Sequence, residues 1–210
     1  NSNGTFVWAK QFGAPNESIN IAALGLDVNN NVIIAGEFFN SVDINFDAPV
    51  VTFNTGVDVF SDTYIMEVSA AGAFTWAKQL RTTSALPIVF DANYPEEIVI
   101  DDNDNILIIG WLRGAMDLDP GAGNVTLNSN TGEGVYIAKY SSTGNYLWGG
   151  GVIGPGGLWP RDIKTDVNEN VYVAMYSFGG NIDFDINAGT SMMNTVNGVP
   201  CLLKLNSAGS

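Results

Sequence analysis

The chain has 210 residues, of which 46% are hydrophobic and 14% charged, and its formal net charge is −14. This composition excludes a disordered acidic tail, and the negative charge would repel nucleic acid and anionic membrane surfaces. With no histidine and one cysteine, Cys201, the sequence excludes histidine-dependent catalysis, imidazole metal sites and an internal disulfide framework. No apolar run approaches the ~20 residues of a membrane span. We therefore expect neither a nucleic-acid partner nor a transmembrane segment.

The first expected element is a strand over about residues 5–12, in which Phe6 and Trp8 share one face. Its Phe-x-Trp-Ala-Lys-Gln phrase occurs three times, the last in altered form, at residues 6–11, 74–79 and 146–149. Four glycines mark the same phase and are separated by 68, 72 and 65 residues: Gly4, Gly72, Gly144 and Gly209. A period of this length with internal strand signals indicates a stacked supersecondary unit.

Each unit next contains a hairpin of two short strands joined by a turn rich in Asp and Asn. The three turns are residues 27–31, 101–105 and 166–170. Asp and Asn suit such turns because they tolerate left-handed backbone and bond their own main chain. The turns begin like calcium loops but lack the later glycine and glutamate, so a plain tight hairpin is favoured. The second strand is apolar without alternation and should be covered on both faces.

A longer polar loop leads to the third strand of each unit, at residues 63–68, 135–140 and 200–205. A short turn through the repeat glycine then gives the Trp-bearing fourth strand. In the third copy Gly149-Gly150-Gly151 replaces Ala-Lys-Gln, so we expect that strand to be looser or differently paired. Four-stranded sheets covered on both faces, without helices, indicate β-propeller blades. The units are too long for solenoid coils and too short for immunoglobulin-like sandwiches.

A third recurring motif is an acidic-aromatic loop at residues 45–47, 117–121 and 183–185. Together with the Trp-Ala-Lys phrase and the Asp-(x)3-Asn hairpin, it resembles the SBBP-type (seven-bladed β-propeller) repeat of secreted and cell-surface bacterial proteins. The resemblance covers the whole chain. It implies a propeller fold and an extracellular or cell-surface location, and it does not imply one agreed activity.

The predicted fold is all-β: three four-stranded antiparallel propeller blades of about 65–72 residues, strand-exchanged at the ends. One repeat array fills residues 1–210. Residues 1–12 form an outer strand belonging to a preceding or neighbouring blade, and the blades are 13–80, 81–152 and 153–210, the last lacking its own outer strand.

Three blades cannot close a ring of the usual four to eight. Three outcomes stay open: a segment of a longer propeller, a six-bladed ring made of two copies, or a head-to-tail filament built by strand addition. The residues expected to carry such assembly are Phe6, Trp8, Lys10, Leu202, Leu203 and Leu205.

The acidic loops are the candidate metal site, because calcium prefers six to eight hard oxygen ligands. The candidate ligands are Asp47, Asp117, Asp119, Asp183 and Asp185. Asn45 is expected to replace the first acid of the first loop and to weaken binding there. The alternative is that these aspartates cap their turns through local hydrogen bonds. Calcium is the one cofactor that the sequence suggests.

We expect a non-catalytic extracellular structural, adhesive or assembly module that completes its blades by strand addition. The alternative is a propeller that binds a glycan or surface protein, with calcium-stabilised loops. Tyr94, Trp111 and Trp159 lie near loops and could stack on sugars, or simply pack. A propeller enzyme such as a glycosidase ranks third, because the usual nucleophile and base pairs are absent.

Overall fold

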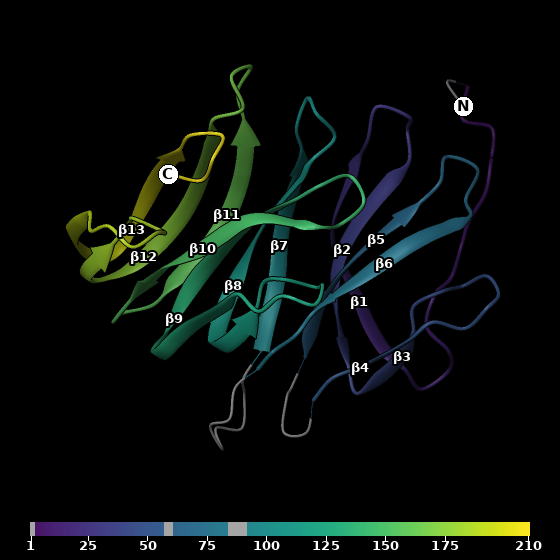
Figure 1. Ribbon diagram of the computed structural model, residues 1–210, viewed down its shortest axis with the longest axis horizontal. Helices are drawn as coiled ribbons and strands as arrows, with labels where there is room; N and C mark the ends of the chain where they lie inside the picture. Colours follow the sequence, from purple (N-terminus) through teal and green to yellow (C-terminus); the bar gives the residue numbers. More distant parts are fainter. Residues whose placement is uncertain (1–2, 57–60, 84–91) are drawn as a thin grey trace.

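The computed structural model describes residues 3–56, 61–83 and 92–210 (Figure 1). Within these residues there are strands and no helix, and so no helix that could cross a membrane. The strands are β1 (Ser18–Leu26), β2 (Val32–Phe39), β3 (Ser41–Asp43), β4 (Thr52–Asn54), β5 (Asp62–Val68), β6 (Phe74–Leu80), β7 (Ala92–Ile100), β8 (Ile106–Asp117), β9 (Thr126–Tyr140), β10 (Tyr146–Gly154), β11 (Leu158–Thr165), β12 (Val171–Asp183) and β13 (Met192–Leu205). The prediction of an all-β fold is confirmed.

The strands form three antiparallel units that follow one another along the chain. The first unit is the sheet β1–β2–β5–β6, with β3 and β4 paired beside it. The second is β7–β8–β9–β10, and the third is β11–β12–β13. A single residue pair, Ile153 with Asp183, joins β10 to β12 and links these two units into one sheet. Figure 1 places the N-terminus at one end of the row of units and the C-terminus at the other.

Apolar clusters between the units form the core and explain the second hairpin strand of the middle unit. In β12 of the last unit, by contrast, buried and partly exposed residues alternate over residues 171–176, so the expected cover on both faces is not found there. In β8, Ile106 and Ile108 pack in a cluster with the first unit, whereas Leu107 and Ile109 pack in a cluster with the third. All four side chains are fully buried. Because neighbouring strand residues point to opposite faces, a strand between two units must be apolar throughout, as predicted. Each such burial contributes roughly 1.5–3 kcal/mol.

One cross-strand pair shows how the repeats conserve volume. Tyr64 lies opposite Gly36, and in the second unit Tyr136 lies opposite Gly110. A side chain on either glycine would collide with the tyrosine ring and with the backbone of the neighbouring strand. In the third unit this pair is Met175 and Cys201, so the larger residue has changed strands. Cys201 thus occupies the position that holds Tyr64 and Tyr136 in the other units, and it is half-buried.

The polar loops before the third strands are more ordered than expected. In the first unit they form the pair β3–β4. In the second, residues 115–117 pair with 126–128, which extends β8 and β9, and β12 and β13 are extended in the same way. Their Thr and Asn residues give little hydrophobic signal, although pairing satisfies their backbone donors and acceptors.

The Trp-bearing segments differ in their pairing. Residues 5–12, expected to be the outer strand of a preceding or neighbouring blade, pair with no strand of the described chain. The triple-glycine strand β10, expected to be looser, pairs with β9 along its whole length apart from one bulge. Its glycines allow close packing, since a Cβ at Gly150 would strike the backbone of Ile186. The missing side chains make room for the neighbouring loop.

Candidate functional site

The hairpin turns share one hydrogen-bonded clamp. In each turn the aspartate Oδ1 accepts the backbone N–H groups of the residues two and four positions later, and the closing Asn side chain donates to the same carboxylate. The residue before the closing Asn has a φ near +60° in every turn: Asn30, Asp104 and Glu169. The side-chain bond from Asn170 leads the contacts that lower the pKa of Asp166 to about 2. The tight-hairpin interpretation accounts for these carboxylates.

The turns also bond to each other from unit to unit. The backbone N–H of Val28 donates to Asp104 Oδ1 at 2.9 Å, and the Asn103 side chain donates to Glu169. In both cases the acceptor is the positive-φ residue of the following turn. Hydrogen bonds therefore link the three hairpin turns, the first to the second and the second to the third.

The acidic loops repeat a different local bond. Asp117 Oδ1 accepts the N–H of Asp119 at 3.0 Å and that of Val125 at 2.8 Å. Asp183 and Asp43 make the corresponding two bonds in the third and first units. The first acid of the first loop is therefore Asp43. The loop was expected at residues 45–47, two residues too late, so Asp43 was missed. Asn45, expected to replace the first acid, replaces the second.

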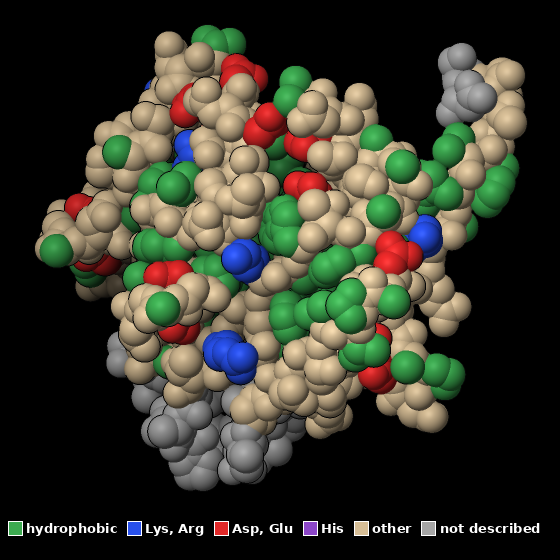
Figure 2. All heavy atoms as spheres, turned by 45° about the vertical axis from the view of Figure 1, so that its right-hand side comes forward, with side chains coloured by type: hydrophobic (Ala, Val, Ile, Leu, Met, Phe, Trp, Pro, Cys, Tyr) green, Lys and Arg blue, Asp and Glu red, His purple; other side chains and the backbone are tan. Residues whose placement is uncertain are grey.

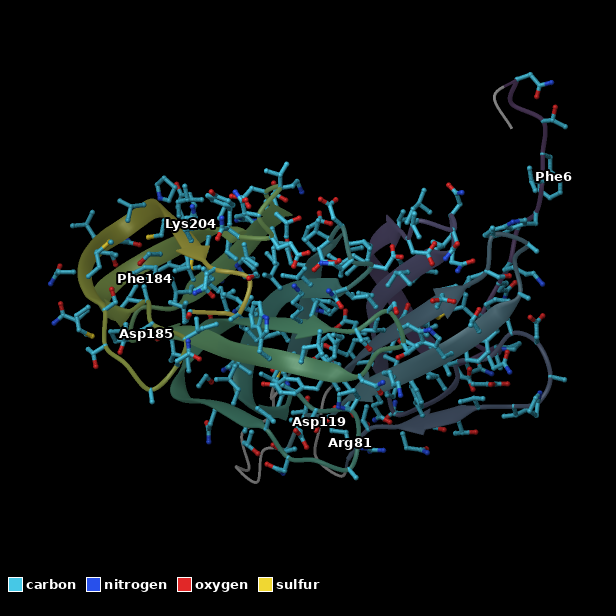
Figure 3. The ribbon with its side chains drawn as sticks, turned by 45° about the horizontal axis from the view of Figure 1, so that its top comes forward. Phe6, Arg81, Asp119, Phe184, Asp185 and Lys204 are labelled. Carbon is cyan, nitrogen blue, oxygen red and sulfur yellow. The ribbon has the colours of Figure 1, made fainter. Side chains whose placement is uncertain are left out.

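The predicted calcium ligands lie in separate loops, as Figure 3 shows for Asp119 and Asp185. Asp119 Oδ1 accepts the N–H of Gly121, and Asp185 Oδ1 accepts that of Asn187. No group of three or more Asp, Glu, Cys or His side chains gathers in the part of the chain that the structure describes. The turn-capping alternative accounts for the contacts seen, and calcium binding stays a prediction.

Asp47 has a distinct role, because it joins the N-terminal segment to the first unit. Its carboxylate accepts the backbone N–H of Phe74 at 2.9 Å and lies 3.3 Å from the Lys10 ammonium. The Phe74 bond, followed by Lys10, holds the pKa of Asp47 below its ordinary value. One predicted metal residue and one predicted assembly residue are thus partners.

The three tryptophans of the repeated phrase all pack against the repeat glycine of the following unit, although the indole N–H of Trp76 donates to Glu67 of its own unit. A Cβ added to the repeat glycine would lie 2.9, 2.8 and 2.7 Å from the indole rings of Trp8, Trp76 and Trp148 respectively. The indole N–H of Trp8 donates to the Ala70 carbonyl, and that of Trp148 to the Ser207 carbonyl, both at 3.1 Å. Trp8 therefore contacts the first unit as the outer strand of a preceding unit would.

Before Trp8, the N-terminal segment stands away from the body (Figure 2), and Phe6 points into solvent (Figure 3). The Phe6 side chain is 78% exposed. On the adjacent face of the first unit, Leu24 is 63% exposed, although Ile98 and Ile163 at the same position of the later units are buried. This face is built like an interface between units.

The opposite end shows the complementary face. Leu203 and Leu205 pack toward the second unit, whereas Leu202 is 73% exposed. At the position of Leu202, the earlier units have Ile65 and Ile137, which are fully buried against the next unit. Among the described residues β13 pairs only with β12, so its outer edge is open. The predicted assembly residues thus lie at opposite ends of the molecule.

Comparison with known proteins supports the repeat character. No protein-family model matches the chain. The chain is 23% identical over 212 aligned positions to an uncharacterized WD repeat-containing protein, L264, of Acanthamoeba polyphaga mimivirus. That alignment covers 90% of this chain and 14% of the viral protein. A WD-repeat relative and an all-β fold of successive antiparallel units together fit a β-propeller.

Proposed function

We propose that the chain forms three consecutive blades of a β-propeller and acts as a non-catalytic assembly module, whose ends join further blades by strand addition. The observation that carries this proposal is the contact of Trp8 with the Ala70–Gly72 turn, which repeats the contact of Trp148 with the next unit. Residues 5–12 would then be the outer strand of a blade whose other strands come from elsewhere.

The open edge of β13 supplies the other half of the argument. An added strand there satisfies a whole row of main-chain donors and acceptors. In the partner blade Phe6 becomes buried, which contributes roughly 2–3 kcal/mol, and Trp8, already packed on the Gly72 turn, gains less. The two ends lie far apart in Figure 1, so the partner is another chain or further blades of a longer one. An extracellular or cell-surface location, which the resemblance implies, and a structural or adhesive role both belong to this proposal.

The test is the association state of the purified chain. We expect light scattering to show concentration-dependent self-association that is lost when residues 1–12 are deleted. Leu202→Asp, at the exposed C-terminal face, should also give monomers. Leu147→Asp changes an exposed leucine of the middle unit and is the matched control, so it should leave association unchanged.

A second measurement covers the case in which the natural partner is another part of a longer chain. A peptide of residues 3–13 is added to the deletion variant, and hydrogen exchange is followed along β13. Protection of the β13 amides supports strand addition. A monomeric chain together with unprotected β13 amides contradicts it.

A further inference from the structure

A cleft at the beginning of β7 and β11 lies outside every contact used for the assembly role. Its volume is about 370 Å³, at the lower end of the ~300–1,000 Å³ usual for ligand pockets. It lies between the second and third units and is lined by Tyr94, Glu96, Trp111, Trp159, Pro160 and Arg161. The structure thus gathers the three aromatic residues that the sequence suggested for stacking on sugars.

Comparison of the three units shows that the fold does not require aromatic residues here. The same cross-strand position holds Tyr94 and Trp111 in the second unit and Trp159 and Tyr176 in the third. In the first unit it holds Asn20 and Glu37, joined by a side-chain hydrogen bond of 3.2 Å. Since one unit folds with a polar pair, the three aromatic residues that line the cleft, Tyr94, Trp111 and Trp159, are not a requirement of the fold.

The aromatic rings hold one another in place and leave one of them available. The rings of Tyr94 and Trp111 are stacked, with centroids 5.4 Å apart and an interplanar angle of 14°. Phe178 contacts Trp159 edge-on, with centroids 4.9 Å apart. Trp159 is nevertheless 45% exposed. It is a supported apolar platform that a ligand can reach.

Polar groups surround this platform. The Arg161 guanidinium lies 5.6 Å from the Trp159 ring centroid, and Glu96 provides an exposed carboxylate on the same wall. The indole N–H of Trp111 is buried and has no acceptor among the described residues. A buried donor left without a partner costs about 1–3 kcal/mol, and this one belongs to a residue of the cleft wall.

We propose that this cleft binds the hexopyranose ring of an uncharged glycan. The C–H face of such a ring is apolar and suits the Trp159 indole, while its hydroxyls can accept from Arg161 and donate to Glu96. A quaternary ammonium ligand needs the open faces of several rings, but Tyr94 and Trp111 cover each other. An acidic sugar is disfavoured by the net charge of −14. This inference goes beyond the assembly role and does not depend on it.

The test uses the full chain and the methyl glycosides of glucose, galactose and mannose, with choline as the comparison ligand. We expect saturable binding of at least one sugar by calorimetry, accompanied by a change in tryptophan fluorescence. Trp159→Ala and Arg161→Ala should each weaken binding about tenfold, equivalent to 1.4 kcal/mol. Trp111→Phe keeps a ring but removes the N–H, and should weaken binding less than Trp159→Ala.

The matched control is Leu147→Ala, which shortens an exposed apolar side chain that does not line the cleft and should leave affinity unchanged. Circular dichroism verifies that each variant is folded. If Trp159→Ala does not fold, Arg161→Ala still tests the proposal, because it keeps all the aromatic packing. Absence of sugar binding, preferential binding of choline, or equal affinity in wild type and Arg161→Ala would overturn the proposal. Repeating the measurement on the variant lacking residues 1–12 separates sugar binding from assembly.

Discussion

Replacing Lys139 by Met should destabilise the protein strongly, because it leaves a buried carboxylate without its cation. The Lys139 ammonium lies 2.7 Å from Asp101 Oδ2, and the two side chains are 5% and 0% exposed. Glu169, in the turn of the next unit, lies 3.6 Å from the same ammonium. The lysine therefore compensates charge from two units at once.

The size of the loss follows from the contacts that remain. Removing one partner of a buried ion pair costs about 3–5 kcal/mol. Asp101 keeps the backbone N–H groups of Asn103 and Asn105 and the Asn105 side chain, which places the expected loss near 3 kcal/mol. For a chain of this size that lowers Tm by roughly 6–12 °C. Asp101→Asn combined with Lys139→Met should cost less than the sum of the single changes, with a coupling of about 2 kcal/mol.

Denaturant unfolding at pH 7 measures these differences, and a pH series identifies their source. Burial favours the neutral acid, but the bonds from Lys139 and the Asn residues outweigh it and hold the pKa of Asp101 below 3.8. A pKa lowered in the native state stabilises the protein above the ordinary value, and this contribution is lost as pH falls through the native pKa. The advantage of wild type over Lys139→Met should therefore shrink below pH 3.8. A loss under 1 kcal/mol at pH 7, as at an exposed ion pair, would refute the reasoning.

Three further predictions concern single residues. Gly144→Ala should lower the free energy of unfolding by at least about 1–2 kcal/mol, because Gly144 has a φ of +73° and its new methyl would strike an indole ring. Gly198 also has a positive φ, +79°, but lies in open space, so Gly198→Ala isolates the backbone cost in the same unfolding assay. Asn170→Ala should move the pKa of Asp166 from about 2 back toward 3.8 in an NMR titration, and an unchanged value would show that this amide does not set it. Burial, only partly offset by hydrogen bonds, raises the pKa of Glu37 above 4.5. The free energy of unfolding should therefore decline as pH rises through the raised pKa. Glu37→Gln should remove this pH dependence, and an equal dependence in the two proteins would contradict the assignment.

The features that the sequence predicted well are those that recur at one phase of the repeat. The continuous apolar run Ile106–Ile109 indicated burial on both faces, and its residues divide between two clusters. The Asp-x-Asn turns indicated tight hairpins, and the repeated Trp marked a strand apart from the hairpin. In each case one physical requirement acts within a few neighbouring residues, so the pattern stays visible in the chain.

The features that it missed depend on contacts between segments. The acidic loops differ in length and composition, so Asp43 could be found only from the two backbone bonds it shares with its counterparts. The Lys139 position holds Glu in the first unit and Lys in the third, and its partner Asp101 lies on a different hairpin. Tyr94 and Trp159 are distant in the sequence, and the packing of two units makes them neighbours. No local pattern specifies such pairs.

Comparison of the three units distinguishes residues that the fold of every unit requires from residues that differ between units. The aspartate of the hairpin turn and the first aspartate of the acidic loop make the same backbone bonds in all three units, as expected of structural residues. The cross-strand position at the cleft differs in every unit: Asn with Glu, Tyr with Trp, and Trp with Tyr. The first unit folds with a polar pair at this position, so the fold of a unit does not require aromatic rings there. A residue repeated in every unit serves the unit, so ligand specificity is expected at positions where the units differ, and this is one of them that is exposed in a cleft.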